Sequence, residues 1–191
     1  SFQIPSNKKS LKIDFNRFID DQTFLELKKL NLNNCFKDPT FLREKLMIEI
    51  INQYVPSIRC SYARVYLNDH YWGLYTLVEQ VDKTFCQSRF GSGEDGNLYK
   101  GDPHGTLRWQ GTDPDPYRQN YEKVTNEEGD DWTDLIDLID ILNNTPLESL
   151  DDSLGRRLQF VEWLKFIAVN NFLVNLDSYL GSGHNYFLYH R

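Results

Sequence analysis

The sequence predicts an α+β fold in two lobes, a small β-rich N-terminal lobe over residues 1–82 and a mainly helical C-terminal lobe over residues 83–191. Three observations predict this fold. Short segments of the first lobe alternate apolar and polar residues, as half-buried strands do. One amphipathic helix lies among them, and two longer helical patterns occupy the second half. Hydrophobic residues make up 40% of the 191 residues and aromatic residues 14%, which is enough to build a core.

Composition excludes several classes of protein. The net charge is −7, so nothing suggests non-specific nucleic-acid binding, which depends on a cationic surface. A local basic pocket for phosphate stays open. The absence of a run of about 18 apolar residues predicts that there is no membrane span. The three cysteines, Cys35, Cys60 and Cys86, are widely spaced and form neither a zinc pattern nor a disulfide framework. Neither a Gly-x-Ser-x-Gly nor an HExxH motif occurs, which argues against a hydrolase.

Two strands are expected first, over residues 9–18 and 24–33. In the first, Leu11, Ile13 and Phe15 alternate with polar residues. The pair Lys28-Lys29 interrupts the alternation of the second, so we expect a bulge or a register change there.

A helix is predicted over residues 39–54, because Asp38 can cap it and Pro39 suits a first helical position. At ~100° per residue its apolar face comprises Leu42, Leu46, Met47, Ile50, Ile51 and Tyr54. Arg43 falls near the middle of that face. Glu44 and Glu49 lie at its margins, and Lys45 points away. A guanidinium keeps its charge, so Arg43 either snorkels or pairs inside the fold, or it points into a cleft that holds an anion. The helix alone favours the first reading.

A hairpin is expected over residues 61–78, since two aromatic and β-branched strands flank a short polar turn. Residues 79–82 leave the second strand and form the boundary between the lobes. A short helix over residues 83–90 comes next. The glycine-rich loop 91–96 does not read as a phosphate-binding loop, because it contains two acids and is not followed by Lys-Ser/Thr.

After this loop we expect a short strand over residues 97–100, followed by an irregular segment, 101–126. A helix over 131–142 should face inward with Trp132, Leu135, Ile136, Ile139 and Leu142. Its acidic row, Asp134, Asp137 and Asp140, reads as a solvated face. A long helix over 158–176 is apolar on most sides, which predicts a central position in its lobe. The loop 175–185 and a strand over 186–189 end the chain, and since a domain seldom stops in mid-strand, we expect a fragment.

Asp177 and Asn185 are the residues of this last loop that suggest chemistry. Phosphoryl transfer needs an acid near the accepting hydroxyl and oxygen ligands for magnesium, and protein kinases supply them with an Asp followed five residues later by an Asn. Here the spacing is eight, so in isolation a surface turn explains the pair better. The order of the elements, however, is that of a protein-kinase-like fold. In that fold the strand at Lys28-Lys29 supplies a nucleotide-contacting lysine paired with a helix acid, and Glu79-Gln80-Val81 is the hinge against adenine.

A family resemblance becomes specific at several blocks of sequence. They are Leu30–Asn33, Asp38–Leu46, Trp72–Lys83, Gly96–Lys100, Asn175–Asp177 and His184–Tyr189. In this order they resemble the CotH family of spore-coat and secreted atypical kinases. The resemblance implies a kinase that uses ATP and Mg²⁺ to phosphorylate serine in secreted, cell-surface or spore-coat proteins. Some relatives are modules of secreted, cellulosome-associated proteins.

The resemblance also assigns residues. Asp177 matches the catalytic Asp, Asn185 the metal-ligating Asn, Arg43 and Lys45 an Arg-x-Lys-Leu signature, and Glu79 with Gln80 a Glu-Gln hinge signature. It reverses the reading of Arg43, which is then expected to contact phosphate. Lys29 is expected as the strand lysine with Lys28 as the alternative, and Glu44 and Glu49 both remain candidates for the helix acid.

The family's second metal-binding Asp falls beyond Arg191, which leaves other functions open. The runner-up is a non-catalytic, pseudokinase-like scaffold that presents residues 101–126 to a partner. Phosphorylation of a small molecule is a third option, because a fold does not set its substrate. An incomplete C-terminal lobe would also favour dimers.

Overall fold

The computed structural model describes residues 7–91 and 96–191, so most of the glycine-rich loop at 91–96 lies outside the described residues. The chain forms two compact units, Ser1–Gly91 and Ser92–Arg191, and each is described by itself. Both combine antiparallel sheet with helix, which confirms the α+β class. A kinase-like arrangement of two lobes stays a prediction. Among the described residues, no helix combines the length and the apolar character needed to cross a bilayer.

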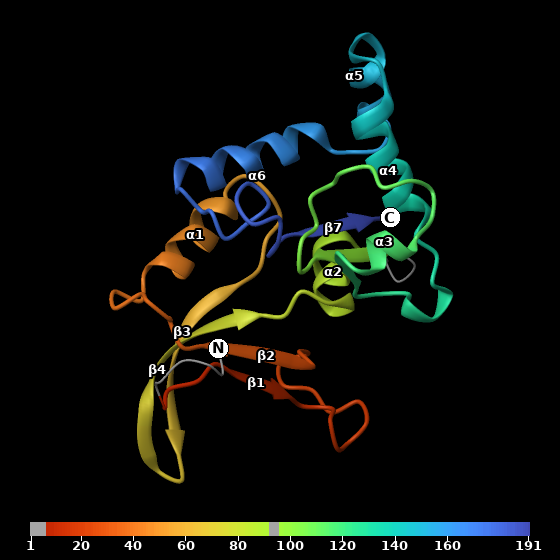
Figure 1. The fold of residues 1–191 in the computed structure, drawn as a ribbon. Helices are drawn as coiled ribbons and strands as arrows, with labels where there is room; N and C mark the ends of the chain where they lie inside the picture. The colour runs from red at the N-terminus through yellow and green to blue at the C-terminus, as the bar shows by residue number, and fades with distance from the viewer. Residues whose placement is uncertain (1–6, 92–95) are drawn as a thin grey trace. The chain divides into compact units, whose positions relative to one another are not determined.

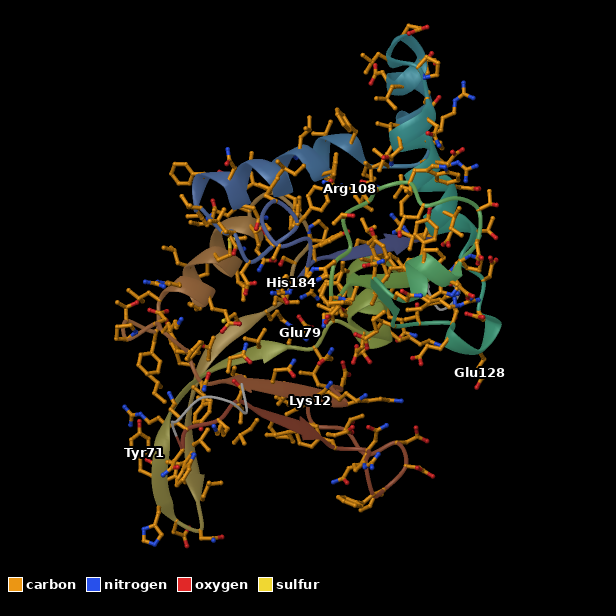
Figure 2. All side chains as sticks on the ribbon, in the orientation of Figure 1. Lys12, Tyr71, Glu79, Arg108, Glu128 and His184 are labelled. Carbon is orange, nitrogen blue, oxygen red and sulfur yellow. The ribbon has the colours of Figure 1, made fainter. Side chains whose placement is uncertain are left out.

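The first unit is built on a four-stranded antiparallel sheet in the order β1-β2-β4-β3 (Figure 1). Its elements are β1 Leu11–Asp14, β2 Lys29–Asn33, α1 Arg43–Ile51, β3 Cys60–Leu67, β4 His70–Glu79 and α2 Lys83–Phe90. The hairpin of β3 and β4 and the short helix α2 are confirmed. Asn68 and Asp69 both have left-handed backbones, as the tight turn of a hairpin requires. Tyr71, beside that turn, is exposed (Figure 2).

The strand expected over residues 24–33 is shorter in the structure. Leu25 and Glu26 have φ values of 49° and 66°, and Phe24 and Leu27 form an isolated bridge across them. The chain therefore turns back at this point, and β2 begins only at Lys29. The register shift of this sheet lies in β3, between Val65 and Tyr66, and not at Lys28-Lys29 as the sequence suggested.

Helix α1 begins at Arg43 rather than at Pro39, because Phe41 has a φ of 61° and interrupts the helical path. Asp38 still closes the first turn, since its carboxylate accepts the backbone N–H of Arg43 at 2.9 Å. The buried face differs from the predicted one. It carries Glu44, Ile48, Ile51 and Val55, spaced as one helical stripe, of which the three apolar residues are buried. Leu42, Leu46 and Tyr54 of the predicted face are exposed.

The second unit contains a three-stranded antiparallel sheet with β5 in the centre, in the order β6-β5-β7. Its elements are β5 Asn97–Gly101, α3 Asp115–Arg118, β6 Tyr121–Lys123, the 3₁₀ turn Glu127–Gly129, α4 Thr133–Asn144, α5 Leu147–Gly155, α6 Phe160–Phe172 and β7 Phe187–His190. The predicted strands at 97–100 and 186–189 and the helix at 131–142 are confirmed within two residues. Helix α5 was not predicted, and α3 and β6 lie in the segment expected to be irregular.

Tyrosine hydroxyls hold the extended segment between β5 and β6. Tyr117 accepts the N–H of Gln110 and donates to the carbonyl of Gly111, each at 2.9 Å. Tyr121 accepts the N–H of Leu107 at 2.9 Å, and Tyr186 donates to the carbonyl of Gly105 at 2.5 Å. Burial raises the pKa of Tyr121 and Tyr186, so both stay protonated. These rings belong to one core cluster, which further comprises Tyr99, Leu107, Trp132, Leu135, Ile136 and Ile139.

Two expectations about the helices of this unit are wrong. Asp134 does not lie on a solvated face: its side chain is only 11% exposed and accepts bonds from Asn97, Tyr99 and His190. The donors come from β5 and β7, whose contact the helical pattern could not indicate. Helix α6 is not central to its unit as predicted. Val161, Leu164 and Phe172 are exposed, and only Val169 and Asn170 of this helix are buried.

Of the three cysteines, Cys86 is buried, and Cys35 and Cys60 are partly exposed. All three are free thiols. Burial raises the pKa of Cys60 and of Cys86 to about 11, so both carry their proton at neutral pH. A protonated thiol is a poor nucleophile and metal ligand, which agrees with a packing role.

Candidate functional site

The loop after α6 is anchored by a buried asparagine. Asn170 is 1% exposed, and its amide nitrogen donates to the carbonyl of Phe166 one turn earlier at 2.8 Å. Its side-chain oxygen accepts from the Asn175 amide at 2.9 Å, and its backbone carbonyl accepts the N–H of Asn175 at the same distance. Val174 takes a left-handed backbone, which ends the helix. The chain therefore leaves α6 in a fixed direction toward Asp177.

Residues 176–183 then close on themselves. The carbonyl of Ser178 accepts the N–H groups of Ser182 and Gly183 at 3.1 and 3.0 Å, and the carbonyl of Leu176 accepts that of Ser182 at 3.1 Å. Ser178 is buried, and its hydroxyl donates to the carbonyl of Asn175 at 2.6 Å. Gly183 has a φ of 68°, where glycine is the favoured residue. This closure brings the residues on either side of the loop together.

Asp177, His184 and Asn185 meet at the mouth of this loop. Asp177 Oδ1 lies 2.8 Å from His184 Nε2, and the Asn185 amide donates to the backbone carbonyl of Asp177 at 3.2 Å. The side chain of Asp177 is 75% exposed and that of His184 is 31% exposed. The two residues singled out for phosphoryl transfer thus share one structural feature. His184 was not assigned a role from the sequence, although it directly precedes Asn185.

Gly181 is required for the closure of this loop. A Cβ at this position would lie 2.0 Å from the carbonyl oxygen of Leu176, which is backbone and cannot rotate away. We expect Gly181→Ala to destabilise the second unit by about 1–3 kcal/mol, as other overpacked sites do. Urea unfolding measures the difference. Gly155→Ala is the control, since a Cβ there has no atom within 4 Å. Equal stability of the two variants would contradict the role assigned to Gly181.

The chain belongs to the CotH kinase protein family. A family profile of that description matches residues 2–191, which confirms the resemblance seen in the sequence. The chain is also 27% identical over 188 residues to the inner spore coat protein H of Bacillus subtilis strain 168. The match covers 95% of this chain and 49% of that protein, so the chain spans about half the length of this relative.

The other CotH candidates lie in the first unit, and three of them have partners that were not predicted. Lys29 pairs with Asp14 on β1 at 4.0 Å, so the expected pair with an acid of the helix is not formed. Arg43 does not point inward: its side chain is 77% exposed, with Asp38 4.0 Å away. The reason is that Arg43 lies off the stripe of Glu44, Ile48 and Ile51 that faces inward. Lys45 forms an ion pair with Glu49 one turn along the same helix.

Glu44 and Glu49, the two candidates for the helix acid, have different surroundings. Glu49 is 57% exposed and faces Lys45. Glu44 turns toward the sheet, where it accepts a bond from Asn33 of β2 at 2.6 Å. Burial raises the pKa of the Glu44 carboxyl, and the bond from Asn33 opposes that rise. Glu44 is therefore the acid of this helix that contacts the sheet.

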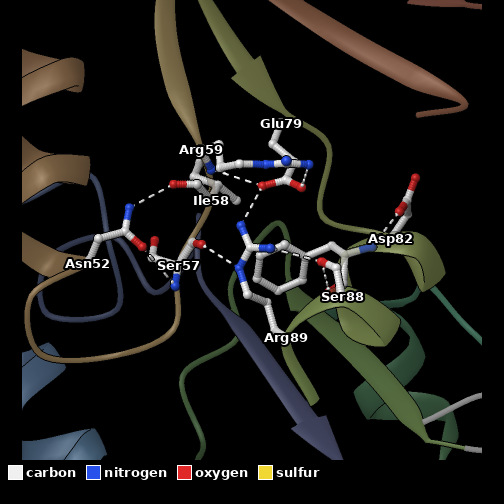
Figure 3. Close-up of polar contacts among 9 residues, drawn as sticks. Asn52, Ser57, Ile58, Arg59, Glu79, Asp82, Ser88 and Arg89 are labelled. Carbon is white, nitrogen blue, oxygen red and sulfur yellow. Dashed lines mark hydrogen bonds and ion pairs between the residues drawn. The ribbon is translucent and has the colours of Figure 1, made fainter. Parts of the chain in front are cut away.

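Glu79, in the predicted hinge segment, forms a buried ion cluster (Figure 3). Its side chain is 3% exposed, and its two oxygens accept from the guanidinium groups of Arg59 and Arg89, both at 2.8 Å. The backbone N–H of Arg59 donates a third bond at 2.9 Å. This carboxylate ties the start of β3 and the end of α2 to the end of β4. Sequence reasoning missed both arginines, because each lies far along the chain from Glu79.

Gln80 follows as a second fixed residue of this segment. Its side-chain oxygen accepts from Asn31 of β2 at 3.1 Å, and its amide donates to the carbonyl of Val81 at the same distance. The predicted role of Glu79 and Gln80 at adenine stays a prediction. The side chains are engaged within the unit, so any recognition of a base here would depend on backbone groups.

The oxygen atoms at Asp177 and Asn185 suit a hard cation. Mg²⁺ is usually bound through one or two carboxylates together with substrate phosphates, and it keeps several waters. This loop offers a carboxylate from Asp177 and an amide oxygen from Asn185. The amide nitrogen of Asn185 makes the bond to Asp177, which leaves its oxygen for a cation. Within residues 7–91 and 96–191, no group of three or more His, Cys, Asp or Glu side chains gathers as a metal site. The donor set thus fits a magnesium that phosphate helps to hold.

Proposed function

We propose that this chain carries part of a CotH-type kinase site that uses ATP and Mg²⁺ to phosphorylate serine hydroxyls of a protein. The observation that carries the proposal is the carboxylate of Asp177, exposed and hydrogen-bonded to His184 beside Asn185. Phosphoryl transfer depends chiefly on positioning and on charge stabilisation, and it needs an acid that accepts the proton of the attacking hydroxyl. Bound ATP with Mg²⁺ would supply the transferred phosphoryl group.

In this proposal each residue of the site has its own role. Asp177 accepts the proton of the serine hydroxyl. Asn185 offers its amide oxygen to the cation. The exposed guanidinium of Arg43, which keeps its charge, is suited to a phosphate. Lys29 and Lys45 are further cations proposed for the nucleotide, and Glu44 holds the helix that carries Arg43 and Lys45 against the sheet.

The substrate is proposed to be a secreted, cell-surface or spore-coat protein. The support for a spore coat is the relative in Bacillus subtilis, which is named as an inner spore coat protein. Secretion and cellulosomal association are proposed from the family alone.

A calorimetric titration of ATP into the full-length protein, with and without Mg²⁺, tests nucleotide use. We expect saturable binding that strengthens with Mg²⁺ and that weakens about 10- to 150-fold in Arg43→Ala, because one charge-assisted bond contributes about 1.5–3 kcal/mol. Arg64→Ala is the control, since Arg64 is an exposed arginine on β3. Absence of ATP binding at any Mg²⁺ concentration would contradict the proposal.

A non-catalytic scaffold is the second candidate, favoured by the segment that the tyrosine hydroxyls hold between β5 and β6. A segment that is held by such bonds and that exposes side chains such as Arg108 is a suitable contact surface for a partner (Figure 2). If ATP does not bind while deletion within this segment abolishes partner binding, the scaffold would be the better account.

A further inference from the structure

The contact between His184 and Asp177 can form with either a neutral or a protonated imidazole. The distance of 2.8 Å between Nε2 and Oδ1 is typical of a charge-assisted hydrogen bond. Nε2 carries a proton in one neutral tautomer of histidine and in the imidazolium ion, so it can donate in both states. The bond also engages only one carboxylate oxygen. The bond from His184 is to Oδ1, and among the described residues no protein group donates to Oδ2 of Asp177.

The backbone around this contact is fixed on both sides. Asn185 holds the carbonyl of Asp177, and Gly183, directly before His184, donates its N–H to the carbonyl of Ser178. A carboxylate that is 75% exposed on such a loop would still turn about its own side-chain bonds. A bond from a partly buried imidazole restricts that rotation.

We propose that His184 is the positioning residue of Asp177, holding Oδ1 so that Oδ2 faces the hydroxyl of the acceptor. The kinetic part of this proposal rests on the proposed kinase function, whereas the contact itself does not. Reactive groups need support from neighbouring residues to stay within about 0.5 Å of a productive geometry. A misplacement of about 1 Å can lower a rate about 10²-fold.

Proton NMR of the imidazole N–H groups tests the contact between His184 and Asp177 without an activity assay. We expect a slowly exchanging, downfield N–H resonance from His184 in the wild-type protein, assigned by its loss in His184→Gln. It should also disappear in Asp177→Ala. His190 is the internal control, because its Nδ1 lies 3.0 Å from Asp134 and should keep its resonance in Asp177→Ala. Absence of the His184 resonance in the wild-type protein would overturn the proposal.

The positioning role is tested by kinetics of phosphoryl transfer in the full-length protein. We expect His184→Ala to lower kcat about 10- to 100-fold with little change in the KM for ATP. His184→Gln should recover most of the loss, since its amide nitrogen can take the place of Nε2. An unchanged kcat in His184→Ala would overturn the role. If the wild-type protein transfers no phosphate, the proposed function fails, and the NMR result alone decides the contact.

Discussion

Replacing Asp177 by Asn is expected to lower the rate of phosphoryl transfer about 10²- to 10⁴-fold, the usual contribution of a general base. The amide has nearly the shape of the carboxylate, and its oxygen can still accept the bond from His184. It cannot accept the proton of a serine hydroxyl. Transfer of labelled phosphate from ATP to an acceptor protein by the full-length protein measures the change.

The matched control for this variant is Asp152→Asn, an exposed acid on α5 outside the loop. It removes the same charge and should leave the rate unchanged. Both variants should unfold within about 0.5 kcal/mol of the wild-type protein, because exposed substitutions seldom do more. A wild-type rate in Asp177→Asn would remove Asp177 from the chemistry, and an equal loss in the two variants would point to net charge instead.

Replacing Glu79 by Ala is expected to destabilise the first unit by about 3–5 kcal/mol, the effect of removing one partner from a buried ion pair. The carboxylate is 3% exposed and joins β4 to both Arg59 and Arg89 (Figure 3). Without it, the guanidinium of Arg89, whose side chain is 21% exposed, stays partly buried without its counter-charge. Guanidinium chloride unfolding followed by circular dichroism measures the loss.

Arg59→Ala is the comparison that tests the cause. The Arg59 side chain is 64% exposed, so its ion pair with Glu79 is partly screened by solvent and should contribute only up to about 1 kcal/mol. If Arg59→Ala and Glu79→Ala destabilise the unit equally, the burial of Glu79 is not the source of the effect. A native-like stability of Glu79→Ala would show that the cluster is dispensable for folding.

Local patterns in the sequence predicted most of the secondary structure. The hairpin of β3 and β4, helix α2 and helix α4 follow from strand alternation, a short polar turn and helical spacing, all of which act over a few residues. These patterns could not show which other strand or helix each element would pack against. In α1 the stripe of Glu44, Ile48 and Ile51 faces inward, although the predicted face is more apolar. Glu44 on this stripe accepts a hydrogen bond from Asn33 on β2. In α4, the side chain of Asp134 is only 11% exposed, because β5 and β7 provide donors.

The candidate site was predictable to a similar extent. Asp177 and Asn185 could be singled out by residue type and by the order of the elements, and the structure brings them into one loop. The bond from His184 depends on how residues 176–183 close, which residue types alone do not give. The contacts of Glu79 could not be predicted from local patterns either. A Glu-Gln pair after a strand was matched to a hinge, but its ion pairs with Arg59 and Arg89 could not be read from any local pattern.

The sheet of the second unit also determines how that unit can form. Its central strand, β5, pairs with β6 nearby in the chain, but Asn97 of β5 pairs with His190 of β7, almost the whole length of the unit away. Closing so large a loop costs chain entropy before the contact returns any stability. Pairings of this kind slow folding. During synthesis, β6 is therefore the only strand of this sheet available to β5 until β7 has been made, so the other edge of β5 stays unpaired until then.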